Sequence, residues 1–243
     1  MPRRLLELFS GSGTLSSVFE EAGWLCVSVD NDPKCMATHC VDIMSFYYEQ
    51  YPPGYFDLVH ASVPCTEYSV AKTTGVRKLE EADELVRKSR EIIRYFGTNW
   101  IIENPYTGLL KGRDVMADLR PYLKRVCYCK YGTEANPYLY RKETAIWTSI
   151  DWTPRPLCSQ FERCEHYDHE NGRHPAHAQK GPSGRLLTNN YRTRQLYSIP
   201  RSLCEEWLWA IEDGYSTTAT TGSDVELTPV NLEPLRLGGV GEA

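Results

Sequence analysis

The sequence predicts an α/β protein built on a doubly wound, mostly parallel β-sheet, and two observations lead to this prediction. Apolar runs of strand length recur through residues 1–150, and several are separated by stretches with the spacing of an amphipathic helix. Strands that alternate with helices pair in parallel, because each helix crosses back over the sheet before the next strand. The expected strands are residues 5–9, 24–30, 55–65, 99–105, 127–132 and 143–150, and the expected helices are residues 14–23, 79–96 and 202–212.

Turn residues and helical periodicity mark the limits of these elements. The first strand runs into two glycines, and the helix that follows stops at Gly23. The strand at 55–65 comes after the turn at 52–54, whose sequence is Pro-Pro-Gly. Near the C-terminus, Leu203, Trp207 and Ile211 recur at helical spacing, so we expect one apolar helix face there.

The regular pattern divides the chain into four parts. Residues 1–150 form the main domain, and regular patterning stops in residues 151–190, which carry four of the six histidines. A helix returns in residues 191–213. Residues 214–243, with the polar stretch STTATTGSD, are expected to be a flexible tail.

Composition and charge exclude several classes of protein. No apolar run approaches the roughly 20 residues of a membrane-spanning helix, and the first residues lack the core of a signal peptide. We therefore expect a soluble protein of the cytoplasm or nucleus, in a bacterium or a host cell, whose nine cysteines are reduced. The net charge is −5, but residues 111–201 hold 16 Lys and Arg against 9 Asp and Glu, a surplus of 7 positive charges. Such a basic block suits a surface that faces phosphates.

The turn after the first strand has the form of a nucleoside-binding site. Gly11 and Gly13 let the backbone approach a ligand closely at the start of a helix, and Phe9 precedes them. Asp30 ends the next strand, where a carboxylate can hold both hydroxyls of a ribose, and Asp42 could meet an adenine amino group. These residues do not separate a nicotinamide cofactor from a methyl donor. A simple tight turn with Asp30 as a helix cap is the structural alternative.

A thiol and a carboxylate are expected at the ends of two other strands. Pro64 and Cys65 follow an apolar strand, at the sheet edge where doubly wound folds place their ligands. The polar segment 66–78 comes next and is expected to be a mobile loop that closes on a substrate. Glu103 and Asn104 end the strand 99–105. The two strand ends would present a nucleophile and a carboxylate to one crevice.

Five motifs occur in a fixed order along the chain. They are FSGSG at 9–13, VPC at 63–65, IENP at 102–105, KYG with YRKETAIWT in 130–148, and YSIPRSLCEEWLWAI at 197–211. In this order they resemble the motifs of the DNA (cytosine-5)-methyltransferase family, over about residues 4–148 and 191–212. The resemblance implies a Rossmann-like, class I S-adenosylmethionine-dependent methyltransferase fold, in which residues 151–190 are a small target-recognition insert. An insert of this length implies a short target sequence or little selectivity.

The resemblance also implies a reaction and a set of site residues. Cys65 would add to C6 of a cytosine flipped out of double-stranded DNA, Glu103 would bind the N3 edge and exocyclic amine, and C5 would take a methyl group from S-adenosylmethionine. Arg141 is the expected third catalytic contact. The expected cofactor-binding residues are Phe9, Gly11, Gly13, Asp30, Asp42, Pro64, Ser198 and Ile199. The expected substrate-binding residues are Ser69, Lys72, Asn104, Arg155 and Arg185.

The chain departs from the family pattern at three motifs. Pro105 takes the place of a valine after Glu-Asn, and Tyr197 takes the place of an asparagine in the last motif. Arg141 is the one recognisable member of the usual arginine pair, because Lys142 and Glu143 follow it. These departures indicate a divergent, compact member of the family, of a viral or phage-like branch.

The insert is rich in potential metal ligands. Two cysteines and four histidines lie within residues 158–177, and sulfur and imidazole ligands at such density suit tetrahedral zinc. The expected ligands are Cys158, Cys164, His166 and His169. Polar loop histidines or phosphate contacts are the alternatives. Cys127 and Cys129 alternate on an expected strand and could join the site, although a buried strand face is the simpler interpretation.

Three other functions fit parts of the sequence. An amino-group methyltransferase acting on adenine or cytosine N4 is suggested by Asn104-Pro105-Tyr106, but its motif should end the strand occupied here by residues 62–65. An NAD-dependent oxidoreductase would share the glycine turn and leave Cys65 without a role. A non-catalytic DNA-binding relative would have no need of both Cys65 and Glu103. The sequence does not specify the target bases, RNA against DNA, or oligomeric state.

Overall fold

The computed structural model describes residues 1–133, 138–177, 181–182 and 197–218, and its main feature is a seven-stranded β-sheet. The strand order is β3-β2-β1-β4-β5-β7-β6. The pairs from β3 to β5 are parallel, whereas β7 runs antiparallel to both β5 and β6. This is the order of a doubly wound sheet with one antiparallel strand inserted before the last, so the predicted fold class is confirmed.

The described elements have the following bounds. The strands are β1 (Arg4–Leu8), β2 (Leu25–Asp30), β3 (His39–Cys40), β4 (Leu58–Ser62), β5 (Asn99–Pro105), β6 (Leu123–Cys127) and β7 (Glu143–Thr148), and β8 (Ala176–His177) pairs with β9 (Gly181–Pro182) in a separate small sheet. The α-helices are α1 (Thr14–Glu21), α2 (Leu79–Phe96) and α4 (Arg201–Thr218). Of the short 3₁₀ helices in the connections, η2 (Ile43–Ser45) and η7 (Tyr128–Tyr131) bear on the site.

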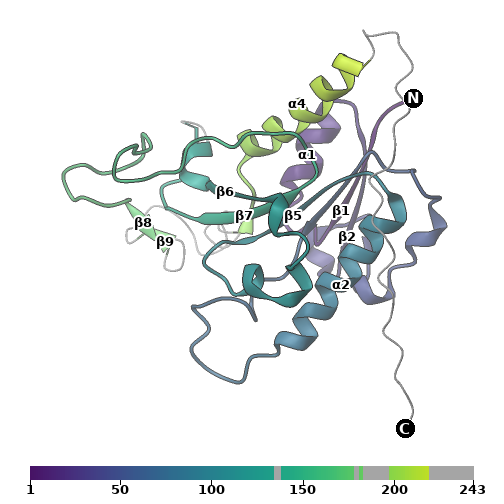
Figure 1. Ribbon diagram of the computed structural model, residues 1–243, viewed down its shortest axis with the longest axis horizontal. Coiled ribbons are helices and arrows are strands. Elements are labelled where there is room, and N and C mark those ends of the chain that lie inside the picture. The colour runs from purple at the N-terminus through teal and green to yellow at the C-terminus, as the bar shows by residue number, and fades with distance from the viewer. Residues whose placement is uncertain (134–137, 178–180, 183–196, 219–243) are drawn as a thin grey trace.

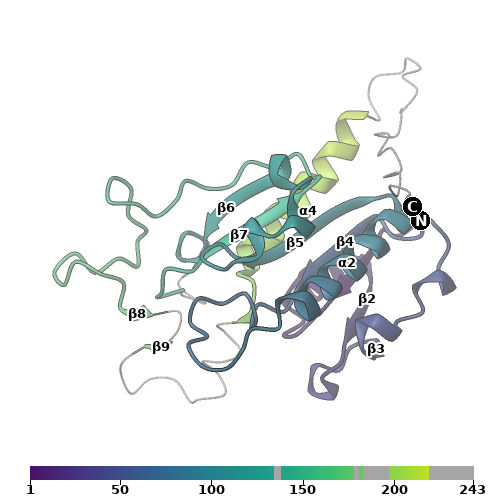
Figure 2. The ribbon, with the colours of Figure 1, turned by 60° about the horizontal axis from the view of Figure 1, so that its bottom comes forward.

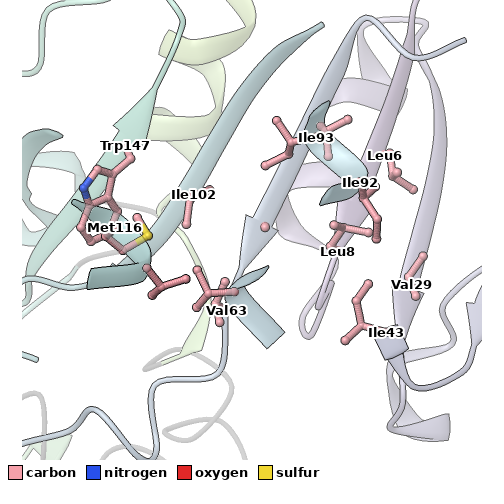
Figure 3. Close-up of a cluster of buried hydrophobic side chains, with 14 of the residues drawn as sticks. Leu6, Leu8, Val29, Ile43, Val63, Ile92, Ile93, Ile102, Met116 and Trp147 are labelled. Atoms are coloured by element: carbon pink, nitrogen blue, oxygen red, sulfur yellow. The ribbon is translucent and has the colours of Figure 1, made fainter. Parts of the chain in front are cut away.

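Both faces of the sheet are covered by helices. Figure 1 shows α1 beside α4, and Figures 1 and 2 show α2 on the other face of the sheet from α4. Successive side chains of a strand point to opposite faces, so Leu5 packs in the cluster with α1 and α4 while Leu6 packs in the cluster with α2. Figure 3 shows this second cluster, in which Ile92 and Ile93 lie near Leu6 and Leu8. Each such buried side chain stabilises the fold by about 2 kcal/mol, which fixes the helices to the sheet.

Helix α2 has clear start and stop signals. Glu80 and Glu81 in its first turn complement the positive end of the helix dipole. Gly97 follows its last residue in the left-handed conformation, with φ of 60°, and its N–H donates to the carbonyl of Ile93 at 3.1 Å. The long helix therefore ends where β5 must begin.

Two elements differ from the prediction. Residues 128–131 form η7, not the continuation of a strand, because pairing of β6 with β7 ends at Cys127 opposite Glu143. The alternating Tyr and Cys residues imitate a strand, but Tyr128, Cys129 and Tyr131 are all buried. Helix α4 extends to Thr218, into the segment expected to be a tail from residue 214; residues 219–243 lie outside the described part of the chain.

Residues 151–177 have little regular structure and lie beyond the β6 and β7 side of the sheet, away from β2 (Figures 1 and 2). The start of this insert is tied to α4, because Trp152 Nε1 donates to Glu206 Oε2 at 3.1 Å. Among the residues that the structure describes, no helix combines the length and apolar character needed to cross a membrane.

Candidate active site

The glycine turn between β1 and α1 is held by its own hydrogen bonds. Phe9, Gly11 and Gly13 have positive φ angles of 57°, 50° and 69°. The Gly11 N–H donates to Asp30 Oδ2 at 2.9 Å, and the Gly13 N–H donates to the Ser10 carbonyl at 2.9 Å. These two amides are therefore not offered to a phosphate, unlike the amides of a dinucleotide-binding turn. Asp30 fixes the turn from the end of β2.

A buried carboxyl group lies beneath this turn. Glu7 of β1 accepts hydrogen bonds from the backbone N–H and the hydroxyl of Ser16 in α1. Burial raises the pKa of Glu7 from an ordinary 4.5 to about 7, although the bonds from Ser16 oppose this shift. Glu7 also lines the adjoining cavity. The site therefore holds a carboxyl group that is partly protonated near neutral pH.

Cys65 and Glu103 reach the same cavity from neighbouring parallel strands. Ser62, the last residue of β4, pairs with Glu103 of β5, and Cys65 follows three residues later. The cavity has a volume of about 860 Å³ and is lined by Cys65, Glu103 and residues of the glycine turn. A volume of this size accommodates a cofactor and a base. The predicted convergence of thiol, carboxylate and glycine turn is thus present.

Two residues beside the antiparallel strands affect the electrostatics of the cavity: Tyr128, which follows β6, and Lys142, which precedes β7. Tyr128 of η7 donates its hydroxyl to Glu103 Oε1 at 2.9 Å, and Lys142 Nζ lies 4.0 Å from the same oxygen. Burial and the charge of Glu103 raise the pKa of the Cys65 thiol, while Lys142 opposes the shift. The resting thiol is therefore protonated at neutral pH, and the balance of the two charged neighbours sets how readily it ionises.

Hydrogen bonds anchor the base of the segment that follows Cys65. The Arg77 guanidinium donates to the carbonyls of Glu67, Ser69 and Lys72, at 2.7 to 2.9 Å. The buried Tyr68 donates to Asp83 Oδ1 at 2.8 Å. Lys72 is paired with Glu67 at 2.6 Å, so its charge is neutralised locally. The loop has a defined base, and its tip around residues 70–76 is largely exposed.

The structure brings half of the sixteen predicted catalytic, cofactor-binding and substrate-binding residues together around the cavity. The cavity is lined by the predicted residues Phe9, Gly11, Pro64, Cys65, Ser69, Glu103, Arg141 and Ile199. Sequence reasoning missed the lining residues Glu7 and Lys142 and the supporting Tyr128. Glu7 lies two residues before the FSGSG motif and Lys142 lies within YRKETAIWT, so their positions in the sequence could have indicated that they line the site. Tyr128 carried no such signal, because it lay in a segment interpreted as a strand.

Four predicted cofactor residues have hydrogen-bonding or capping roles within the protein. Gly13 is the N-cap of α1, and Asp30 holds Gly11. Asp42 is exposed and accepts a bond from the Met44 N–H at 2.8 Å, which caps η2. The Ser198 hydroxyl shares a hydrogen bond with Tyr138 at 2.8 Å, beside the lining residue Ile199. None of these four predicted residues lines the cavity.

Three residues predicted to contact substrate have partners within the protein. Asn104 is fully buried, and its Nδ2 donates to the Val63 carbonyl at 2.9 Å, so it braces the backbone before Cys65 and does not line the cavity. Lys72 is paired with Glu67, as described above. Arg155 is engaged by Glu206 of α4 at 2.6 Å and stacks 4.7 Å from the Tyr131 ring centre, which joins the insert to the main domain. Arg185 lies outside the described residues.

Two of the four predicted metal ligands lie in one cluster of potential ligands in the structure. Cys158 and Cys164 are buried and lie together, but their partners are different from those expected. We name the group the Cys₃His cluster; it consists of Cys129, Cys158, Cys164 and His174. His169 is exposed and packs on Tyr167, and His166 lies against Gly132. His166 and His169 lie outside the cluster, because the chain turns between residues 164 and 174 and brings His174 back to Cys164.

Comparison with known proteins defines the class to which this fold and site belong. A profile of the C-5 cytosine-specific DNA methylase family matches residues 3–107, which contain the glycine turn, Cys65 and Glu103. A protein of Frog virus 3 (isolate Goorha), described as a probable DNA (cytosine-5)-methyltransferase, is 30% identical over 225 residues, which cover 84% of this chain and 98% of the viral protein. The chain belongs to the C-5 cytosine-specific DNA methylase family, as the order of its motifs predicted.

The chain was compared with two solved methyltransferase structures. The Entamoeba histolytica methyltransferase EhMeth superposes with a TM-score of 0.52 at 11% identity, over 88% of this chain and 99% of that one. A SAM-dependent methyltransferase from Archaeoglobus fulgidus matches with a TM-score of 0.39 at 14% identity, over 61% of this chain and 86% of that one. The Rossmann-like methyltransferase fold that the motifs implied is therefore confirmed by the sheet order and by the first of these structures.

Proposed function

We propose that this protein transfers a methyl group from S-adenosylmethionine to C5 of cytosine in DNA, through a covalent bond between Cys65 and C6 of a flipped-out base. The observation that carries the proposal is the position of Cys65 and Glu103, which line one cavity with the glycine turn in a chain of this family. A nucleophile, a carboxylate and a cofactor pocket within one cavity are what transfer between two bound molecules requires.

The cofactor end of the cavity suits a cationic methyl donor. S-adenosylmethionine, when bound, supplies an electrophilic methyl group on a positively charged sulfur. Glu7 lines the cavity, and a positive charge nearby favours the ionised form of its carboxyl group. Phe9, Pro64 and Ile199 add apolar surface. The donors of Gly11 and Gly13 are already used within the protein, which disfavours the pyrophosphate of a nicotinamide dinucleotide.

Cys65 and Glu103 act on different parts of the base: Cys65 is the nucleophile at C6, and Glu103 binds the edge that carries N3 and the amine. The Cys65 thiol gives its proton to water or to a basic group at the site, and the thiolate forms a bond to C6; the electron pair of the C5–C6 double bond then makes C5 nucleophilic. Glu103 accepts a hydrogen bond from the exocyclic amine through the carboxyl oxygen that Tyr128 does not occupy, and a proton shared between this carboxyl group and N3 offsets the negative charge that thiolate addition places on the ring. After C5 is methylated, water or a basic group takes the C5 proton, and the electron pair of that C–H bond restores the double bond and expels the Cys65 thiolate. A base stacked in a duplex cannot enter a cavity of this kind, so it must be flipped out.

Asn104 weighs against the amino-group methyltransferase alternative. In that chemistry the Asn-Pro segment would contact the target amine. Here Asn104 is fully buried, donates to the Val63 carbonyl, and supports the strand end that carries Cys65. The carboxylate on the preceding residue, Glu103, lines the cavity in its place.

Covalent trapping on DNA that contains 5-fluorocytosine tests the proposal. The fluorine cannot leave as a proton does, so the enzyme remains bonded to the base after methyl transfer. We expect a denaturation-resistant adduct at Cys65 that needs S-adenosylmethionine, is lost in Cys65→Ala, and persists in the control Cys26→Ser, whose thiol lies at the start of β2. An adduct at another residue, or no adduct with active cofactor and DNA, would contradict the proposal.

A further inference from the structure

The Cys₃His cluster lies outside the catalytic cavity and joins two distant parts of the chain. Cys129 comes from η7 of the main domain, and the other three members come from the insert. All four residues are buried, and their sulfur and nitrogen atoms lie within 4.8 Å of one another. His174 Nε2 is 3.6 Å from Cys158 Sγ and 3.3 Å from Cys164 Sγ.

We propose that the Cys₃His cluster binds one zinc ion as a tetrahedral structural site. Zinc–sulfur and zinc–nitrogen bonds of about 2.3 and 2.0 Å in a tetrahedron place sulfur and nitrogen about 3.5 Å apart. The two distances to His174 bracket this value. Four protein ligands leave no open position for water or substrate, which is typical of a zinc site that stabilises a fold and does not take part in a reaction.

The insert is shaped so that its ligands converge. The Tyr167 N–H donates to the Cys164 carbonyl at 3.1 Å, which closes a turn directly after this ligand. Asp168 and Arg173 then pair across a tight hairpin, with backbone bonds of 3.0 and 3.2 Å, and Gly172 permits the reversal with φ of 66°. The hairpin returns the chain so that His174 faces Cys164, and the Tyr167 ring packs 5.4 Å from the His174 ring.

Apolar packing alone gives a weaker account of these buried groups. The cluster of buried side chains at this place consists of cysteines only, with partly buried Leu157 and Tyr167 packed against them. Such a small core contributes little to ordering the residues from 151 to 177. Zinc coordination supplies the missing stabilisation in small segments of this kind. Cys127 is buried beside the cluster but is not one of its four members.

The site also connects the insert to the catalytic carboxylate. Cys129 is adjacent in η7 to Tyr128, whose hydroxyl donates to Glu103 Oε1 at 2.9 Å. Lys130, the next residue, pairs with Glu162 of the insert at 2.9 Å. A metal bound at Cys129 therefore holds both the insert and the helical turn that positions the hydroxyl on Glu103.

Metal analysis of the full chain tests this proposal. We would purify the protein from zinc-supplemented medium under reducing conditions, measure zinc by mass spectrometry, and record the absorption spectrum after replacement with Co²⁺. We expect about one zinc per chain, together with thiolate-to-cobalt charge-transfer bands and the intense visible bands of tetrahedral cobalt. His174→Ala and Cys164→Ser are expected to retain less than about a tenth of the zinc.

Matched variants distinguish this ligand set from its neighbours. His169→Ala and Cys127→Ser are expected to keep the wild-type zinc content, because neither residue belongs to the cluster. A wild-type chain that remains free of zinc after reconstitution, or whose cobalt form lacks thiolate bands, overturns the proposal even if the ligand variants fail to fold. Loss of zinc in His169→Ala or Cys127→Ser, with retention in His174→Ala, also overturns it.

Discussion

The catalytic cavity and the Cys₃His cluster bring side chains together in different ways. The cavity residues follow hydrogen-bonded strands: β4 and β5 pair in parallel, and this register carries Cys65 and Glu103 to one sheet edge. The cluster unites η7 with an insert in which the isolated bridge between Asp168 and Arg173 is one of few regular features. Backbone pairing therefore preforms the catalytic cavity, whereas the Cys₃His cluster depends on its side chains and on the ion that we propose they bind.

Loss of a carboxylate should affect the methylation rate strongly in the cavity and weakly in the insert. Glu103→Gln should lower the methylation rate about 10² to 10³-fold, because the amide cannot carry the charge that stabilises the activated base. Glu162→Gln, which removes the partner of Lys130 in the insert, should leave the rate within about twofold. Initial rates of methyl incorporation into DNA measure both variants. Equal rates for Glu103→Gln and wild type would remove Glu103 from the mechanism.

A second expected effect concerns the stability of the preformed cavity. Burial raises the pKa of folded Glu7 to about 7, so this group stabilises the fold below its unfolded pKa of 4.5, and the contribution is lost as the pH rises through 7. The free energy of unfolding of Glu7→Gln, measured relative to that of wild type, should therefore rise by about 2 to 3 kcal/mol from pH 5 to pH 8. Urea unfolding at the two pH values measures this gain. The exposed control Glu49→Gln should show the same pH dependence of unfolding free energy as wild type. The same pH dependence in Glu7→Gln as in wild type would contradict a raised pKa of Glu7.

Metal removal should affect the two regions unequally. With chelator, amide hydrogen exchange in residues 157–174 and in η7 should accelerate about tenfold or more, since their order depends on the proposed zinc site. The parallel strands β1, β4 and β5 should exchange at unchanged rates, because their hydrogen bonds do not involve the cluster. Uniform acceleration across the sheet and the insert would show that the two regions do not differ in this way.

The smallest expected effect refines the electrostatics of the cavity. The negative charge of Glu103 raises the pKa of Cys65 in addition to the effect of burial, while Lys142 lowers it. At a fixed pH below that pKa, Glu103→Gln should speed alkylation of Cys65 and Lys142→Gln should slow it, each by up to about tenfold. Peptide mass spectrometry after timed treatment with iodoacetamide measures the rates. Changes of the same sign in both variants would contradict the described charge balance.

Sequence reasoning predicted the cavity better than the cluster for a physical reason. Periodic apolar runs identified β1, β4 and β5, and parallel strands end at a common edge, so Cys65 and Glu103 could be placed together without coordinates. Periodicity does not apply to the insert. Cys158 and Cys164 could be recognised by residue type, but the choice of His174 over His169 depends on the hairpin at Asp168 and Arg173.

The contribution of η7 was hidden for a related reason. The alternation of tyrosine and cysteine after β6 imitates a strand, whereas tertiary packing buries nearly all of these side chains in a 3₁₀ helix. Both Tyr128, which contacts Glu103, and Cys129, which joins the cluster, depend on that conformation. Charge partners such as Glu206 for Arg155 likewise come from residues far apart in the chain.

Analysis of the modified nucleosides tests the central claim most directly. Unmethylated DNA would be incubated with the protein and isotopically methyl-labelled S-adenosylmethionine, digested, and examined by mass spectrometry. We predict that the label appears in 5-methyl-2′-deoxycytidine and is absent when Cys65→Ala replaces the wild-type protein. Label in N4-methylcytosine or N6-methyladenine, or 5-methylcytosine formed equally well by Cys65→Ala, would contradict the account.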